Sequence, residues 1–188
     1  KPNLRIKSVK VQQRFFLENV ISDADYVFLK RKLKQEDNKE WYFIVRFLCA
    51  TGSRISELIK IKVEHVNVGY IDLYTKGGKI RRIYIPSALK KETIVWIKET
   101  LQIESGYLFM NRFGERITTR GISQQLKNFA VKYGIDPKVV YAHSFRHRFA
   151  KNFLEKYNDI ALLADLMGHE SIETTRIYLR KTASEQQA

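Results

Sequence analysis

In the first part of the chain, the spacing of apolar and polar residues predicts helices. The stretch ISDADYVFLKRKL predicts a helix capped by Ser22, with acidic residues that complement the dipole of its first turn. Residues 41–50 are strongly apolar and are followed by Gly52, which predicts a second helix with a glycine at its C-cap. The stretch SRISELIKI then predicts a short helix capped by Ser53 or a close neighbour.

The period changes to two in the stretch GYIDLYTKGGKIRRIYIP. Ile71 and Leu73 alternate with polar or aromatic residues, and the alternation resumes around Ile83 after a Gly-Gly pair. Two runs rich in β-branched and aromatic residues on either side of Gly-Gly predict a β-hairpin, which ends at Pro86.

The rest of the chain is mostly helical in pattern, and the stretch GYLFMN is consistent with a third short strand. Together these elements predict a mainly α domain with a small antiparallel β-sheet, an α+β fold. The remaining predicted helices lie near residues 87–103, 119–133, 144–157, 159–167 and 172–179.

Size and composition place the chain among globular proteins. Its 188 residues suffice for one domain with its own core, and 44% of them are apolar. The single cysteine, Cys49, cannot form an internal disulfide, which favours an intracellular setting. No apolar run approaches the roughly 20 residues of a membrane span. The start, KPNLRIKSVK, lacks the apolar region of a signal peptide and has no initiator methionine, so we interpret the chain as part of a longer protein.

Charge narrows the choice of partner. The chain carries a formal net charge of +14, and its basic residues cluster at positions 30–34, 76–82 and 112–120. An excess of this size usually indicates a polyanion, and nucleic acid is the first interpretation. A domain with a merely basic surface is the alternative.

Several polar residues lie at segment junctions, where side chains from distant segments can meet. Arg54 begins a helix, Lys76 and Lys79 flank the hairpin tip, and His169 follows a Met-Gly pair. Tyr178 lies nine residues beyond His169. Each has an ordinary structural explanation when taken alone, such as a surface ion pair, a solvated lysine or a packed aromatic ring.

The stretch HSFRH raises the question of a metal. His143 and His147 are four residues apart and share a helix face, as in the zinc motif H-E-x-x-H. Here Ser144 replaces the general base, and Arg146 would repel a divalent cation. With no cysteine or acidic cluster nearby, we expect no metal site.

An oxyanion fits these cations better. Arginine makes bidentate phosphate contacts, and phosphoryl transfer mainly requires positioning and charge stabilisation. No G-x-x-x-x-G-K-[ST] loop is present, which argues against nucleotide triphosphates. A tyrosine can act as nucleophile when nearby positive charge favours its phenolate, and a lysine on a hairpin tip can act as the acid.

At this point the sequence resembles the tyrosine recombinases, or phage-type integrases. The matching stretches are ATGSRISEL with Arg54, TKGGKIRRIYIP with Lys76, HSFRHRFA, and LMGHESIETTRIY. Their order and internal spacings agree with the family, and the resemblance spans the chain from about Ser22 onward. It implies the tyrosine recombinase catalytic-domain fold.

The resemblance also implies a role for each matching residue. Arg54 and Arg146 would clamp the scissile phosphate, while His143 and His169 would hydrogen-bond to it. Tyr178 would attack the phosphorus and form a covalent 3′-phosphotyrosyl link to DNA.

Other residues would assist the reaction. Lys76 would protonate the departing 5′-oxygen, and Lys79 is a rival for that role that the sequence does not separate from it. Glu57 would brace Arg54, and His147 would support the site from behind. No metal and no cofactor are needed, because the covalent ester conserves the energy of the phosphodiester.

The resemblance further implies a setting. We expect residues 1–20 to be a linker from a missing N-terminal DNA-binding domain and residues 21–188 to be the catalytic domain. The partner would be double-stranded DNA at specific recombination sites, bound by a homo-tetramer of the full-length protein. The isolated domain would be a monomer or associate weakly. The expected place is the bacterial cytoplasm at the nucleoid, and the expected role is integration and excision of a mobile element.

Two residues depart from the common family pattern: Ala142 stands where proline is common, and Met167 where leucine is common. Neither bears on the implied chemistry. Three alternatives stay open: a type IB topoisomerase, a DNA-binding module without activity, and a metal-dependent nuclease.

Overall fold

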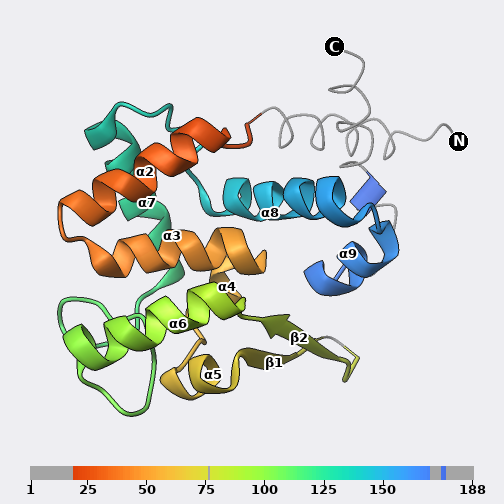
Figure 1. The fold of residues 1–188 in the computed structure, drawn as a ribbon, viewed down its shortest axis with the longest axis horizontal. Coiled ribbons are helices and arrows are strands. Elements are labelled where there is room, and N and C mark those ends of the chain that lie inside the picture. The colour runs from red at the N-terminus through yellow and green to blue at the C-terminus, as the bar shows by residue number, and fades with distance from the viewer. Residues whose placement is uncertain (1–18, 76, 170–174, 177–188) are drawn as a thin grey trace, which may run out of the picture.

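The computed structural model describes residues 19–75, 77–169 and 175–176, and it is mainly helical (Figure 1). Strands β1 (Tyr70–Tyr74) and β2 (Ile80–Tyr84) pair antiparallel, with Tyr70 opposite Tyr84. They form the only sheet among these residues. The expected α+β class is therefore confirmed. The helices are α2 (Asp23–Gln35), α3 (Lys39–Thr51), α4 (Ile55–Leu58), α5 (Val63–Val68), α6 (Ser87–Trp96), α7 (Thr119–Tyr133), α8 (Ala142–Tyr157) and α9 (Ile160–Met167), and a π-helical turn, η1 (Ile97–Leu101), continues α6.

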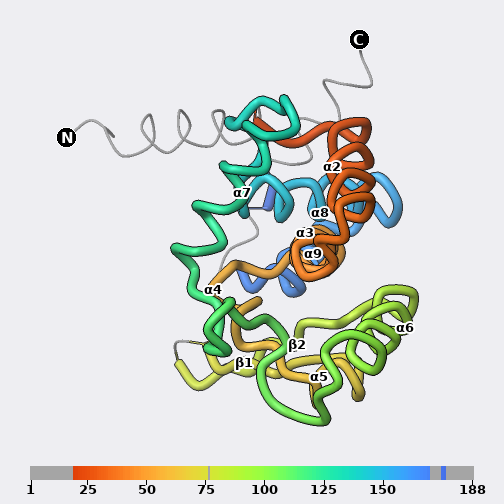
Figure 2. The backbone as a smooth tube through the Cα atoms, turned by 90° about the vertical axis from the view of Figure 1, so that its left-hand side faces the viewer, coloured from red at the N-terminus to blue at the C-terminus, as the bar shows by residue number. Residues whose placement is uncertain are grey.

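Helix α3 is the centre of the fold. It packs against α2, α4, α6 and α8, and Figure 1 shows it between α8 above and α6 below. In Figure 2, α4 lies between α7 and the β-hairpin, and α4 contacts α7. This arrangement brings α2, the first described helix, and α8, which lies more than 100 residues later, against the same helix.

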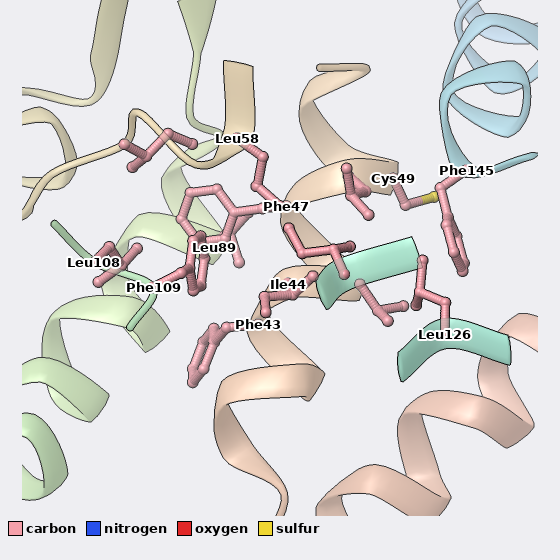
Figure 3. Close-up of a cluster of buried hydrophobic side chains, with 14 of the residues drawn as sticks. Phe43, Ile44, Phe47, Cys49, Leu58, Leu89, Leu108, Phe109, Leu126 and Phe145 are labelled. Atoms are coloured by element: carbon pink, nitrogen blue, oxygen red, sulfur yellow. The ribbon is translucent and has the colours of Figure 1, made fainter. Parts of the chain in front are cut away.

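The core is built on the apolar face of α3. Phe47 is fully buried and meets Phe109 edge-on, with ring centroids 5.6 Å apart. Figure 3 shows these rings beside Leu58 and Leu89, while Phe145 reaches in from α8 near Cys49. Burial of such side chains is worth about 1.5–3 kcal/mol each, so this cluster is the main source of stability.

The helix ends follow the sequence signals in most places. The Ser22 side chain accepts a hydrogen bond from the Asp25 backbone N–H at 3.1 Å, as predicted for an N-cap. Gly52 closes α3 in the left-handed conformation, with φ of +65°. A side chain there would also collide with the Phe149 ring, so glycine serves both the turn and the close approach of α8.

Helix α4 is capped at Arg54, a close neighbour of Ser53 as the prediction allowed, and the Glu57 carboxylate accepts the Arg54 N–H. Two predicted helix bounds need correction, and one helix was missed. Helix α8 begins earlier than expected, after Tyr141. The predicted helix of residues 87–103 is regular only to Trp96 and continues as η1, where Trp96 and Ile97 are both buried. Helix α5 was not predicted.

The stretch GYLFMN does not join the sheet. Tyr107 and Met110 each form one isolated bridge, to Lys62 and Arg116. Between them Leu108 and Phe109 are both buried, and this breaks the alternation that a one-faced strand requires. The predicted third strand is therefore wrong, and this stretch is irregular apart from its two bridges.

The two faces of the hairpin differ. Ile80, Arg82 and Tyr84 of β2 are exposed, whereas Arg81 and Ile83 point inward and are buried. A charged residue thus occupies an inward position of the strand. Among the described residues, no helix is both long enough and apolar enough to cross a membrane.

Candidate functional site

Arg54 lies in the short connection between α3 and α4. Its backbone N–H donates to Glu57 Oε1 at 2.8 Å, and its guanidinium lies 3.7 Å from Glu57 Oε2. The Arg54 side chain is 39% exposed and the Glu57 side chain 12%. Glu57 therefore orients an arginine whose cationic end still reaches solvent.

Arg146 comes from the first turns of α8 and is only 3% exposed. Its guanidinium donates to the Gly52 carbonyl at the end of α3 and, at 2.6 Å, to the Met167 carbonyl at the end of α9. Helix C-termini carry partial negative charge, which suits a buried cation. Arg146 thus joins three helices at one point.

His169 is delivered to this point by the end of α9. Gly168 takes the left-handed conformation, and the His169 N–H bonds to the Ala164 carbonyl at 2.9 Å. Its Nδ1 lies 2.6 Å from the Thr175 hydroxyl. Partial burial, with Arg146, Arg54 and Arg81 nearby, lowers the pKa of His169 to about 4, so the ring is neutral at pH 7.

His143 lies at the start of α8, one turn before His147. The residue reaches the surface, and partial burial of its ring together with the charges of Arg146 and Arg54 lowers its pKa. The His147 ring is buried, with its centroid 6.1 Å from that of His143. The two histidines therefore face different surroundings, although they share a helix face.

The structure brings four of the predicted residues together. Arg146 lies one turn after His143 and binds the backbone carbonyls two residues before Arg54 and two residues before His169, so these four residues form one cluster, here called the cation cluster. The charges of Arg54 and Arg146 also lower the pKa of both histidines. The cluster combines fixed positive charge with neutral imidazoles. Such a set can bind an oxyanion while it also accepts or donates a proton.

A cleft of about 790 Å³ is lined by residues of the hairpin and by the end of α9. Lys79 lines it on the hairpin side and His169 on the other. Lys79 can therefore approach the same space as the cation cluster. Two further predicted residues, Lys76 and Tyr178, lie outside the described residues.

Sequence reasoning missed two residues of this region. Thr175 is fully buried and holds His169, and Arg81 is buried beneath the Glu57 carboxylate, with which it forms an ion pair. The alternation of β2 contained a signal for Arg81, because its position shares the inward phase of Ile83. No comparable pattern along the chain pointed to Thr175.

The described residues do not offer a metal centre. Among them, no three side chains of His, Cys, Asp or Glu gather in a way that could hold a metal ion. His143 and His147 approach each other beside the Arg146 charge, which disfavours a bound cation. The chemistry that this site supports is that of an anionic ligand.

The sequence of the chain is similar to those of known proteins. Residues 21–185 match the phage integrase family model. Over 146 residues the chain is 37% identical to the tyrosine recombinase XerA of Pyrococcus furiosus, a match that covers 74% of this chain and 50% of that protein. The chain thus spans half the length of this curated relative.

The fold also resembles solved structures. A crystal structure of XerA recombinase aligns with a TM-score of 0.74 and 25% identity, over 90% of this chain and 65% of that one. The Tn1549 transposon integrase, solved in complex with a circular intermediate DNA, aligns with a TM-score of 0.68 and 20% identity, over 85% of this chain and 60% of that one. These neighbours share the predicted catalytic-domain fold.

Proposed function

The chain belongs to the phage integrase family, and from this premise we propose that residues 21–188 are the catalytic domain of a site-specific DNA recombinase. The domain would cleave and rejoin DNA strands through a covalent 3′-phosphotyrosyl intermediate. We also propose that residues 1–20 link it to an N-terminal DNA-binding domain.

One observation carries this proposal. Arg146 lies one turn after His143 and binds the backbone carbonyls two residues before Arg54 and two residues before His169, so all four residues belong to one region. A scissile phosphate would be bound there by guanidinium and imidazole N–H groups. When the Thr175 hydroxyl donates to His169 Nδ1, the ring carries its proton on Nε2 and can donate it to a phosphate oxygen.

The reaction that these groups support is an in-line displacement. The Tyr178 oxygen forms a bond to phosphorus while the bond from phosphorus to the 5′-oxygen breaks. The tyrosine proton passes to His143, which is neutral at pH 7 because of its lowered pKa. The leaving oxygen takes a proton from Lys76, with Lys79 as the alternative donor.

Cleavage in this form needs no metal and no cofactor, because positive charge from the chain stabilises the transition state. The exposed guanidinium of Arg54 would bind a non-bridging oxygen directly, and Arg146 would provide a second cation from beneath. Attack by a 5′-hydroxyl on the phosphotyrosyl link reverses the steps. Attack by a 5′-hydroxyl of another strand exchanges the strands.

The partners follow from the substrate. The net charge of +14 supports binding to double-stranded DNA. We propose that the full-length protein assembles as a tetramer on two recombination sites in the bacterial cytoplasm, and that it integrates and excises a mobile element. The isolated chain would be a monomer or associate weakly.

Covalent trapping on a pool of many DNA sequences tests whether the protein cleaves DNA through a covalent intermediate. The same experiment identifies the DNA sequence that it cleaves. The full-length protein is incubated in EDTA with a pool of random-sequence duplexes, each nicked so that the cleaved fragment diffuses away. A protein–DNA adduct should appear on a denaturing gel. Sequencing of the trapped DNA should then reveal a shared site.

Two variants make the test specific. Tyr178→Phe should abolish the adduct while DNA binding persists, whereas Tyr157→Phe, which alters an exposed tyrosine at the end of α8, should leave it unchanged. Cleavage that requires a divalent metal and leaves no adduct would overturn the proposal. Relaxation of supercoiled plasmid without site preference would favour a topoisomerase, and binding without any adduct would indicate an inactive DNA-binding module.

A further inference from the structure

Arg81 is an inward-pointing arginine on the strand that follows the hairpin tip. It is 5% exposed, while its neighbours Ile80 and Arg82 face solvent. A buried guanidinium is costly unless it is both paired and hydrogen-bonded. The groups that bind the Arg81 guanidinium therefore indicate its role.

Two separate elements hold the Arg81 guanidinium. Its Nη1 pairs with Glu57 Oε2, and its Nε and Nη2 both donate to the Leu166 carbonyl, at 3.1 and 3.0 Å. Glu57 is the carboxylate that also orients Arg54. Leu166 lies in the last turn of α9, where carbonyl groups carry the negative end of the helix dipole.

The turn that carries His169 lies directly on this side chain. A Cβ atom built on Gly168 would come within 2.6 Å of Arg81 Cδ and 2.9 Å of its Nε. Only glycine leaves room for this approach, and its φ of +69° also suits the left-handed turn. The backbone before His169 is thus packed onto Arg81 without a spacer.

Arg81 and Arg146 have parallel tasks at the end of α9. Arg81, from β2, binds the Leu166 carbonyl, and Arg146, from α8, binds the Met167 carbonyl. The two arginines fix successive peptide groups from different elements. The direction in which the chain leaves α9 is therefore set by both of them.

We propose that Arg81 is a positioning residue, which holds the Glu57–Arg54 pair, the hairpin strand and the His169 turn in one arrangement. The inference rests on the proposed cleavage reaction and deepens it. Arg81 acts through Arg54 and His169 rather than on the phosphate. It also ties the strand that leaves the hairpin tip to both of these residues.

The geometry requires arginine at this position. The guanidinium sends one nitrogen to a carboxylate and two others to a carbonyl on a different element. A lysine ammonium is a compact point charge without this planar fork. Arg81→Lys should keep the positive charge near His169 but lose the simultaneous hold on Glu57 and Leu166.

The test compares Arg81→Met and Arg81→Lys with Arg46→Met. Arg46 is a suitable control, because it is a part-buried arginine that pairs with Glu92 between α3 and α6. In full-length protein, Arg81→Met should slow adduct formation at saturating DNA about 100-fold, as expected when reacting groups are misplaced by about 1 Å. DNA affinity should stay near that of the parent, and Arg46→Met should not slow the reaction.

A second readout needs no DNA. Titration of the histidine ring signals by NMR, with His169→Gln to assign the resonance, gives the pKa of His169. The groups that face this ring are Arg54, Arg146, Arg81 and the Thr175 hydroxyl. Loss of the Arg81 charge should raise the pKa of His169, while Arg81→Lys should leave it low and still slow the reaction.

A double-mutant cycle with Glu57→Gln tests whether Arg81 acts through that carboxylate. The combined loss in rate should be smaller than the product of the single losses, because both variants disturb the same pair. Multiplicative losses, an unchanged His169 titration in Arg81→Met, or a rate equal to that of Arg46→Met would each overturn the proposal. Should Arg81→Met fail to fold, Arg81→Lys carries the rate test.

The two proposals can fail separately. If the unmodified protein forms no adduct, the proposed recombinase chemistry fails. The titration of His169 in Arg81→Met and Arg81→Lys then still decides whether Arg81 fixes the turn after α9.

Discussion

Around Phe47, α3 is held by apolar side chains, whereas at the end of α9 the guanidiniums of Arg81 and Arg146 bind backbone carbonyls beside the buried Met167 side chain. Apolar packing has little directionality, so it tolerates repacking with side chains of similar volume. Arginine-to-carbonyl contacts are directional and fix a backbone in one place. The molecule thus uses burial for stability and oriented charge for the positions of its functional groups.

The largest expected effect lies on the apolar side of this comparison. Phe47→Ala should lower the free energy of unfolding by about 3–5 kcal/mol, because it leaves a cavity beside Phe109 and Leu58. Urea denaturation followed by circular dichroism measures the loss. The rate of adduct formation per folded molecule should not change, and a large fall in that rate would show that the two regions are not separable.

The next largest effect is expected from the loss of a cation in the cation cluster. Arg54→Ala should reduce the rate of adduct formation by about 10²–10³-fold, as expected when one stabilising donor to a transition state is lost. Stability should change little, because the Arg54 side chain is 39% exposed. Single-turnover kinetics with nicked DNA and a denaturation curve measure both quantities. A stability loss as large as that of Phe47→Ala would contradict the separation between the apolar core, which provides stability, and the charged residues, which position functional groups.

A matched pair of glycines sharpens the comparison. Gly168→Ala and Gly134→Ala both place alanine at a positive φ, of +69° and +68°. Each should cost about 1 kcal/mol or more in backbone strain. A Cβ at Gly134 meets open space, whereas one at Gly168 meets Arg81, so Gly168→Ala should be the more destabilising and the only one to slow cleavage. Equal losses in thermal denaturation would argue against a tight contact with Arg81.

The smallest effect is a dependence of stability on pH. The folded state lowers the pKa of His169 to about 4 from an ordinary value near 6.5, so the unfolded chain binds the proton more readily. This contribution to stability is present above pH 6.5 and is lost as the pH falls toward 4. His169→Gln should remove this part of the dependence. An unchanged pH profile in that variant would place His169 away from the arginines.

Much of the fold was predictable, because its signals are local. Ser22, Gly52 and the hairpin period indicate elements that the structure confirms. The predictions failed where tertiary packing, rather than the local sequence, determines the backbone conformation. The stretch GYLFMN forms isolated bridges because Leu108 and Phe109 are both drawn into the core.

The site was predictable to a different extent. Arg54, His143, Arg146 and His169 were named from separate stretches of the chain, and the contacts of Arg146 bring these stretches into one cluster. Family resemblance supplied that grouping, since residues 94 positions apart, such as Gly52 and Arg146, give no local sign that they will meet. Arg81 was missed because a charged residue in a strand is ordinarily assigned to the solvent face.

The packing of α8 on α3 also has a consequence for synthesis of the protein on the ribosome. Phe145 and Arg146 cannot reach the end of α3 until α8 has been translated, roughly 100 residues later, and α9 follows after that. At about 5–20 residues per second this interval lasts about 5–20 seconds. During it the α8-facing side of α3, including Cys49, lacks its cover. A nascent chain that has not yet reached α8 therefore contains Arg54 but no assembled cation cluster, so the proposed capacity to cut DNA arises only after α8 and α9 have been translated.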